Sequence, residues 1–396
     1  MRLLFVHGAR VVKSEAGRLY TDGSFTQELW NRYLLLSKDF HVLLRDSKEV
    51  VPNKQAQKLS EINEELIGVS VVPDDIKPRS HALNPVVQKE INRIVSYEVQ
   101  KADAIIIRMP SGVGERAVYY AKKYKKNYLI EAVGDVYTAY KYYGGIQGKI
   151  LAPIKREINR KIIREAPFVL YVSNTFLQDR YPTRGISIGC PDVTLNKPNI
   201  DVLRKRINKI HESTEEIILG LIGVLGVNYR GHATAIRTVK VLLNRGINVR
   251  IKFLGSGSPS QWLELSRNLG IEDKVEFCGS LPGGNLVMEW IDDIDILIMP
   301  TKQETLGRAI IEAMSRGCPV VGSRETAIGE QLGSDCLALS DDYEGFADII
   351  ERMVGDLNYM EYCAYENFYR SFKYCNEELD KRRSSFYKRF INKSII

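Results

Sequence analysis

Residues 295–330 contain the feature that most constrains the fold, because an apolar strand, a polar loop and an amphipathic helix follow one another directly. The run Asp-Ile-Leu-Ile-Met, closed by Pro300, is typical of a strand buried on both faces of a parallel sheet. In the helix predicted next, apolar residues recur from Ile310 to Gly317 at spacings of three and four and form one buried stripe. Ligands of open parallel sheets bind at the carboxyl ends of strands, so we expect the loop 301–306 to lie at a binding site.

Two carboxylates flank the start of this helix. Glu304 lies in the loop, and Glu312 lies on the helix, off the apolar stripe. Helical side chains lean toward the N-terminus of their helix, so Glu312 is expected to reach toward Glu304. The helix start near Gly307 offers free N–H groups and a positive dipole end. The pattern suits a ligand with hydroxyls on one part and phosphate on another; the alternative is a surface ion pair of Arg308 with Glu312.

Strands alternate with helices through both halves of the chain, which predicts two doubly wound parallel sheets. In the first half, strands are predicted after Met1 and over 40–44, 66–72, 104–107, 128–133, 169–173 and 186–188, with helices over 26–37, 85–100, 113–124 and 149–165. The predicted division is a first domain over 1–195, a linker over 196–216, a second domain over 217–371 and a helical segment over 372–396.

The length of 396 residues is enough for two domains with separate cores. The chain contains no apolar run of about 18 residues, and a strand is predicted directly after Met1, so we expect neither a membrane span nor a signal peptide. The six cysteines are dispersed, without metal-ligand spacing, which predicts reduced thiols and no structural metal. The expected location is the cytoplasm, and peripheral contact with the inner face of the membrane is a second possibility.

Basic residues gather in one part of the sequence. Residues 101–165 contain fourteen Lys or Arg against six Asp or Glu, although the whole chain carries a net charge of only +7. This segment suits anionic lipid headgroups or a polyphosphate-linked substrate. The alternative is a solvated helical surface, and no nucleic acid partner is expected.

The block that joins Glu304 and Glu312, followed by Ala-Met-Ser-Arg-Gly-Cys-Pro-Val-Val-Gly-Ser, resembles the retaining, nucleotide-sugar-dependent glycosyltransferases of group 1. The resemblance implies a GT-B fold, in which two Rossmann-like domains face a cleft and the last helix crosses back to the first domain. It also implies transfer of a hexose-type sugar from a nucleotide-diphosphate sugar to an acceptor hydroxyl. The nucleotide sugar is then a co-substrate, and neither a cofactor nor a metal is needed. For the last helix, the alternative is a membrane-surface helix.

Several roles follow from the resemblance. Glu312 is expected to bind the ribose hydroxyls, and Glu304 to lie near the sugar or its phosphate. Arg230, which precedes a glycine, matches a basic position that binds the diphosphate. Val224 stands where relatives have a second basic residue, so the cation must come from elsewhere in the chain. The sources considered are Lys302 and Arg308.

Two glycine-bearing turns complete the expected donor site. Gly255 and Gly257, after a predicted strand, either let the backbone approach the nucleotide or make a tight turn. Gly23 and Ser24 occupy a loop that approaches the donor phosphates in the family. The alternative there is that Ser24 or Asp22 caps the following helix.

Strand ends in the first half resemble the subset of the family that assembles bacterial surface polysaccharides. The segments are Ile-Arg108-Met-Pro-Ser, Glu-Ala-Val-Gly-Asp135 and Tyr-Val-Ser-Asn174. Relatives present a histidine near the position of Asp135, which is expected to be catalytic here, while Arg108 is expected to contact the acceptor. Alternatively, each is a strand-end cap. The acceptor implied is a glycan or a lipid-linked glycan.

Other functions on this fold stay open. A nucleotide-sugar epimerase would need no acceptor, and a phosphorylase would need inorganic phosphate. The basic segment also permits a non-catalytic protein that binds polyanions or membranes. Asp293-Ile-Asp295 permits a divalent metal, or merely solvates a helix end. The set Glu304, Glu312 and Arg230 favours the transferase.

Overall fold

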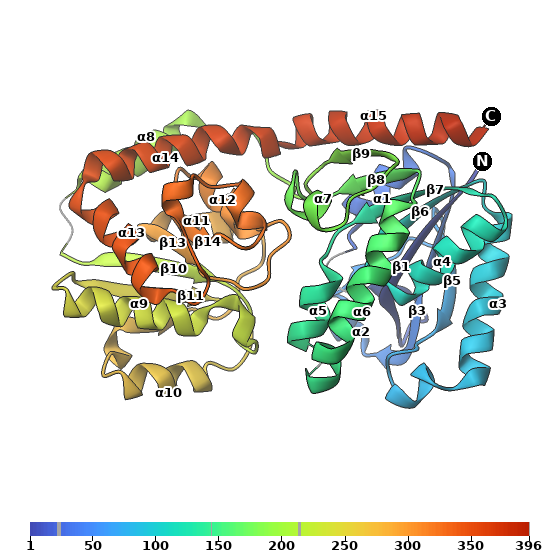
Figure 1. The fold of residues 1–396 in the computed structure, drawn as a ribbon, viewed down its shortest axis with the longest axis horizontal. Coiled ribbons are helices and arrows are strands. Elements are labelled where there is room, and N and C mark those ends of the chain that lie inside the picture. The colour runs from blue at the N-terminus through green and yellow to red at the C-terminus, as the bar shows by residue number, and fades with distance from the viewer. Residues whose placement is uncertain (22–24, 144, 213–214, 396) are drawn as a thin grey trace. The chain divides into compact units, whose positions relative to one another are not determined.

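The computed structural model describes residues 1–21, 25–143, 145–212 and 215–395, so the predictions for Gly23, Ser24 and Asp22 lie outside the described residues. The chain divides into two compact units (Figure 1). Unit 1 contains Met1–Val172, Leu177–Cys190 and the C-terminal segment from Arg382, and unit 2 contains Ser173–Phe176 and Pro191–Lys381. Each unit has its own sheet and core.

The described strands of unit 1 form one sheet: β1 (Arg2–Ser14), β2 (Leu19–Thr21), β3 (Asp39–Val51), β4 (Ser60–Glu61), β5 (Gly68–Pro73), β6 (Ala104–Met109), β7 (Asn127–Ala132), β8 (Phe168–Tyr171) and β9 (Ile186–Gly189). Its parallel part has the order β5-β3-β1-β6-β7-β8-β9, while β2 and β4 pair in antiparallel fashion. The direction of the strand order reverses between β1 and β6, and such switch points are where ligands bind in doubly wound folds.

The helices of this half are α1 (Gln27–Leu34), α2 (Asn53–Ala56), α3 (Pro85–Lys101), α4 (Gly112–Lys123), α5 (Val136–Tyr143), α6 (Gly145–Arg164) and α7 (Phe176–Arg180). Helix α1 begins after Thr26, whose side chain accepts a hydrogen bond from the Leu29 N–H at 3.4 Å. Thr26 directly precedes the first helical residue, which is the position of an N-cap. The interpretation of Ser24 or Asp22 as the cap falls on residues outside the described part of the chain.

Unit 2 has an all-parallel sheet of the order β12-β11-β10-β13-β14-β15 in the described residues. Its elements are β10 (Ile217–Ile222), α9 (His232–Asn244), β11 (Val249–Leu254), α10 (Ser260–Asn268), β12 (Val275–Phe277), α11 (Asn285–Asp293), β13 (Ile296–Met299), α12 (Arg308–Ser315), β14 (Val320–Ser323), β15 (Leu337–Ala338), α13 (Tyr343–Gly355) and α14 (Leu357–Ser371). The order reverses between β10 and β13. The block 295–330 therefore supplies one side of this switch point.

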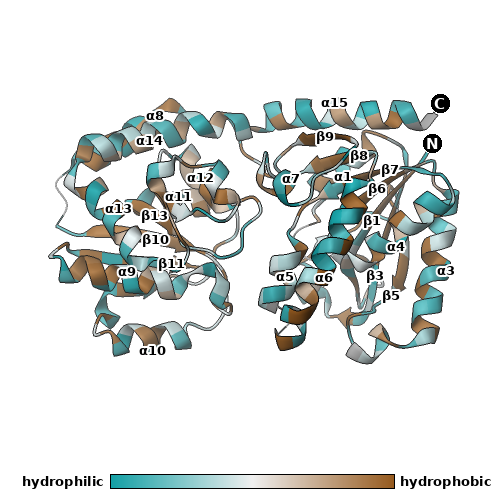
Figure 2. Ribbon diagram, in the orientation of Figure 1, coloured by the Kyte–Doolittle hydropathy of each residue, from teal (hydrophilic) through white to brown (hydrophobic). Residues whose placement is uncertain are grey.

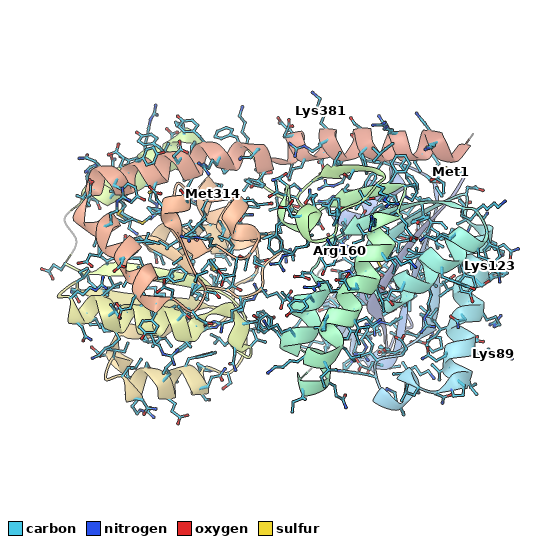
Figure 3. All side chains as sticks on the ribbon, in the orientation of Figure 1. Met1, Lys89, Lys123, Arg160, Met314 and Lys381 are labelled. Atoms are coloured by element: carbon cyan, nitrogen blue, oxygen red, sulfur yellow. The ribbon has the colours of Figure 1, made fainter. Side chains whose placement is uncertain are left out.

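Apolar side chains concentrate on the strands of both sheets, which appear brown in Figure 2. Residues 3–6 of β1 and 296–298 of β13 have no exposed surface. Met314, labelled on α12 in Figure 3, is also fully buried, as the stripe predicted. The prediction of two doubly wound α/β sheets is confirmed.

The chain passes from unit 1 to unit 2 after Cys190 and returns to unit 1 at Arg382, so the predicted linker lies within unit 2. Residues 196–216, predicted as a linker, contain α8 (Ile200–His211), whose Arg206 donates to the Ile294 carbonyl at 2.6 Å within unit 2. The last helix, α15 (Asn376–Ile395), belongs to unit 1 from Arg382 onward. There the rings of Phe386 and Phe390 meet Phe168 at 5.9 and 5.5 Å. Within the described part of the chain, every helix is too short or too polar to cross a bilayer.

Candidate functional site

The loops after β10 and β13 meet at the switch point of unit 2. The Lys302 N–H donates to the Tyr229 carbonyl at 2.8 Å, and the Thr301 hydroxyl donates to the same oxygen at 3.1 Å. Gly231 has φ of 85°, and a Cβ there would lie 2.1 Å from the Pro300 carbonyl oxygen. Only glycine permits this approach of the two loops.

Arg230 and Glu304 form an ion pair between these loops. Arg230 Nη1 lies 2.8 Å from Glu304 Oε2, and their side chains are 27% and 18% exposed. Glu304 Oε1 accepts the Thr305 and Leu306 N–H groups at 3.1 and 3.4 Å. The carboxylate therefore holds the guanidinium at the carboxyl edge of the sheet, where it can bind an anion through its other N–H groups.

Glu312 lies on α12 with its carboxylate half-buried. Burial raises the pKa of Glu312 above its ordinary value, and the nearby Arg308 charge opposes this only in part. Among the described residues, none forms a hydrogen bond or ion pair with the Glu312 carboxylate, while Arg308 itself is exposed. A desolvated acceptor without a protein partner is suited to ligand hydroxyls.

The raised pKa of Glu312 leads to a prediction for the pH dependence of the protein's thermal stability. Because the folded-state pKa of Glu312 exceeds its unfolded value, the ionised carboxylate destabilises the fold above that pKa. Glu312→Gln is therefore expected to raise the midpoint of thermal unfolding of the unliganded protein at pH 7. The gain should shrink as the pH falls and the wild-type side chain becomes protonated. Thermal unfolding between pH 4 and pH 8 measures this; an equal or lower midpoint for Glu312→Gln at pH 7 contradicts it.

Gly307 gives α12 its starting geometry. It has φ of 70°, and a Cβ there would lie 2.7 Å from Gln331 Oε1. Gln331 is 1% exposed, its Nε2 donates to the Leu306 carbonyl, and its buried Oε1 has no partner among the described residues. Gln331 was not predicted as a site residue. The one signal for it in the sequence is its polar side chain between the apolar residues Ile328 and Leu332.

The other predicted donor residues have different surroundings. Lys302 Nζ pairs with Asp341 Oδ1 at 2.6 Å. Val224, at the position of the missing cation, is 46% exposed. A Cβ at Gly255 would lie 1.9 Å from the Gly223 carbonyl oxygen, and Gly257 has φ of 114°. These two glycines therefore close the β11 turn tightly against the β10 turn.

Asp135 is 2% exposed in unit 1 and has several protein partners. It accepts the Tyr137 N–H at 2.9 Å and Arg180 Nη1 at 2.5 Å, and it also accepts the Tyr181 hydroxyl. These contacts anchor the start of α5, so its predicted catalytic role stays a prediction. Asp295 likewise serves the fold, because it accepts the Ile218 N–H at 2.8 Å and pairs with Lys209 at 3.0 Å.

Arg108, predicted to contact the acceptor, lines a cavity of about 530 Å³ at the switch point of unit 1. The lining residues are His7, Gly8, Ala9, Arg10, Val12, Thr21, Phe25, Arg45, Leu59, Arg108 and Val133. Sequence analysis did not single out Arg10 or Arg45. Burial, together with the charges of Arg108 and Arg45, lowers the pKa of His7 to about 3.

Comparison with known proteins matches part of the chain to a family. Residues 216–356 match the family of glycosyl transferases group 1, so the resemblance found in the sequence is confirmed. The match covers the described sheet of unit 2 with Arg230, Glu304 and Glu312. Residues 216–356 are thus similar to group 1 glycosyltransferases.

Individual relatives extend over more of the chain. Protein CapJ of Staphylococcus aureus is 28% identical over 395 residues, which are 99% of this chain and 97% of CapJ. The capsular polysaccharide biosynthesis glycosyltransferase CapM of the same organism is 22% identical over 204 residues, 47% of this chain and 51% of CapM.

Solved structures resemble the whole fold. Sucrose-phosphate synthase from Thermosynechococcus elongatus has a TM-score of 0.67 at 14% identity, with 99% of this chain and 100% of that chain covered. Anabaena HepE in complex with UDP and glucose has a TM-score of 0.64 at 13% identity, with 98% and 99% covered. These likenesses support the predicted GT-B fold.

Proposed function

We propose that this protein is a retaining glycosyltransferase that moves a hexose-type sugar from a nucleotide-diphosphate sugar to an acceptor hydroxyl in the synthesis of a bacterial surface polysaccharide. The observation that carries the proposal is the ion pair of Arg230 with Glu304 and, on the helix that follows, the Glu312 carboxylate, which has no hydrogen-bond or ion-pair partner among the described residues. All three residues lie in the segment that matches the group 1 family. The UDP bound to Anabaena HepE supports the donor class, and the name of CapM supports the pathway.

The donor would lie along the carboxyl edge of the unit 2 sheet. Glu312 would accept hydrogen bonds from the ribose hydroxyls. Arg230 and the N–H groups at the start of α12 would bind the diphosphate, where negative charge grows as the bond from the sugar C1 to the phosphate oxygen breaks. Donors fixed in advance stabilise that charge without reorganisation.

Retention is proposed to occur by reaction on one face of the sugar. The acceptor oxygen forms the new bond to C1 as the diphosphate leaves, and the acceptor proton passes to a leaving phosphate oxygen. A double displacement would instead need a carboxylate nucleophile. Both oxygens of Glu304 already accept protein hydrogen bonds, which disfavours that role.

The test is turnover of UDP-, GDP-, ADP- and CMP-sugars by the full chain, with acceptor extracts and with EDTA present. Release of nucleotide that depends on acceptor, with the donor's anomeric configuration kept in the product by NMR, supports the proposal. An altered nucleotide sugar without acceptor would indicate an epimerase, and a strict need for inorganic phosphate would indicate a phosphorylase. Inversion of the anomeric configuration would contradict the retaining mechanism. Inhibition by EDTA would contradict metal independence.

We also propose that unit 1 contacts anionic membranes through α6, where a lipid-linked acceptor would be located. Four isoleucines recur every fourth residue on this helix, and Ile146, Ile150, Ile154 and Ile158 are 80%, 65%, 54% and 40% exposed. The same helix carries six Lys or Arg and one acidic residue. Arg160, labelled in Figure 3, is one of these cations. An apolar stripe beside basic residues suits an interface with anionic headgroups.

The double variant Ile150→Glu/Ile154→Glu is expected to bind vesicles of phosphatidylglycerol and phosphatidylcholine about tenfold or more weakly than wild type, because burial of an aliphatic side chain contributes about 1.5–3 kcal/mol. Sedimentation with vesicles measures this. Val86→Glu, on α3 with Val86 74% exposed, is the matched control and should bind like wild type. Equal binding of all three proteins, or no binding by wild type, would refute the contact.

A further inference from the structure

Three adjacent strands of the unit 1 sheet each bring one arginine to the cavity. Arg10 comes from β1, Arg45 from β3 and Arg108 from β6, and Arg10 pairs directly with Arg45 in the register of the sheet. Like charges on neighbouring strands repel unless counter-charges or a ligand compensate them. Their convergence at the switch point therefore needs an explanation.

A buried carboxylate holds two of the three arginines. Asp74, which follows β5 and is 4% exposed, pairs with Arg10 Nε at 2.8 Å and with Arg45 Nη1 at 2.9 Å. Burial alone would raise the pKa of Asp74, but the Ile76 N–H and the Arg45 charge outweigh it and keep this pKa below the usual value. Arg45 Nε also donates to the Gly8 carbonyl at 2.5 Å. Both guanidinium groups are therefore fixed in orientation.

The third arginine has a carboxylate behind it as well. Arg108 Nη1 lies 3.9 Å from Oε2 of Glu131, which is 4% exposed and also accepts the Tyr33 hydroxyl at 2.9 Å. Neither Asp74 nor Glu131 lines the cavity. Among the described residues that do line it, none is acidic. Arg10 Nη2 also pairs with Glu49 Oε1 at 3.0 Å, and Glu49 does not line the cavity either. The described lining therefore presents arginine side chains and no carboxylate.

The remaining lining suits a sugar that carries an anion. His7 Nδ1 accepts the Ala9 N–H at 3.0 Å, so Nε2 carries the proton of the neutral ring. Its pKa of about 3 means that the ring adds a donor but no charge at neutral pH. The apolar part of the cavity wall is formed by Val12, Phe25 and Leu59. Apolar walls with a few convergent polar groups are typical of small-ligand sites.

We propose that this cavity, the arginine pocket of Arg10, Arg45 and Arg108, binds an anionic group on the acceptor, either a sugar carboxylate or a phosphate, and so selects an acidic acceptor. The inference rests on the proposed transferase function and deepens it. A purely structural ion-pair network would bury its arginines against their carboxylates. Here the arginines border a cavity of about 530 Å³, and the side chains of Arg10, Arg45 and Arg108 are 29%, 12% and 12% exposed.

The test is saturation-transfer NMR and calorimetric titration of the full chain with D-glucuronate, α-D-glucose 1-phosphate and neutral D-glucose at constant ionic strength. We expect at least one anionic sugar to bind and D-glucose to bind at least about tenfold more weakly. Arg108→Gln and Arg10→Gln should each weaken the anionic sugar about tenfold or more, the range of one charge-assisted hydrogen bond. Arg245→Gln, an arginine of unit 2 with three acidic partners, is the matched control.

Binding of glucuronate alone would assign a carboxylate, and binding of glucose 1-phosphate alone would assign a phosphate. Equal binding of D-glucose, or unchanged affinity in both pocket variants, would overturn the proposal. Titration of the same proteins with UDP separates this failure from failure of the transferase function, because the proposed donor residues lie in unit 2. Unchanged UDP binding and thermal unfolding show that a variant is folded. The proposal is also wrong if neither anionic sugar binds the wild-type protein. A lower UDP affinity of the pocket variants in that case would show that the pocket binds the donor.

Discussion

Replacement of Arg230 by Gln is expected to lower kcat for sugar transfer by about 10²–10³-fold, the usual cost of losing one group that stabilises transition-state charge. The physical reason is that Arg230 would face the diphosphate as it leaves, when its negative charge is greatest. The change also leaves Glu304 without its 2.8 Å ion pair, so a carboxylate would face the phosphates uncompensated. Initial rates over a range of donor concentration measure the effect.

Two variants sharpen this prediction. Arg230→Lys keeps the charge but loses the planar fork, so it should recover part of the lost rate. Arg230→Gln/Glu304→Gln removes the unpaired carboxylate and should be faster than Arg230→Gln alone if repulsion contributes. A kcat within about twofold of wild type in Arg230→Gln would exclude a role in leaving-group stabilisation.

Replacement of Glu312 by Ala is expected to raise KM for the donor by about 10–100-fold with kcat changed little. Hydrogen bonds to a charged acceptor contribute about 1.5–3 kcal/mol each, and the ribose hydroxyls are far from the breaking bond. An interaction made equally in the ground state and the transition state affects KM and leaves kcat unchanged.

Glu289, an exposed glutamate on α11, offers the matched control for Glu312. Glu289→Ala should behave like wild type in both constants. If Glu312→Ala instead lowers kcat while KM stays the same, Glu312 acts on the reacting sugar and the assignment to ribose is incorrect.

The strand and the helix of block 295–330 could be predicted from sequence. The continuous apolar run fits only a buried strand, and the apolar spacing of three and four residues fits only an amphipathic helix. The strand at 296–299 and the helix at 308–315 lie where the pattern placed them. The ends of strands were less predictable where pairing with a neighbouring strand determines them. Strand β1 continues to Ser14 because β2 pairs with it at Val12 and Lys13 and β3 pairs with it at Lys13 and Ser14.

The arginine pocket could not be predicted from local pattern. Arg10, Arg45 and Asp74 are far apart in sequence, and they meet only because β1, β3 and β5 are neighbours in the sheet. Arg108 was noticed because it ends an apolar strand, which is a local signal. Gln331 likewise depends on a tertiary contact with the loop before α12.

The most direct test of the central claim is calorimetric titration of the full chain with UDP, GDP, ADP and CMP, repeated with Glu312→Ala. The account predicts that one nucleotide binds wild type with one-to-one stoichiometry and that Glu312→Ala binds it at least about tenfold more weakly, a loss of about 1.4 kcal/mol. Absence of binding by every nucleotide, or equal affinity in the two proteins, would contradict a donor site built on Glu312.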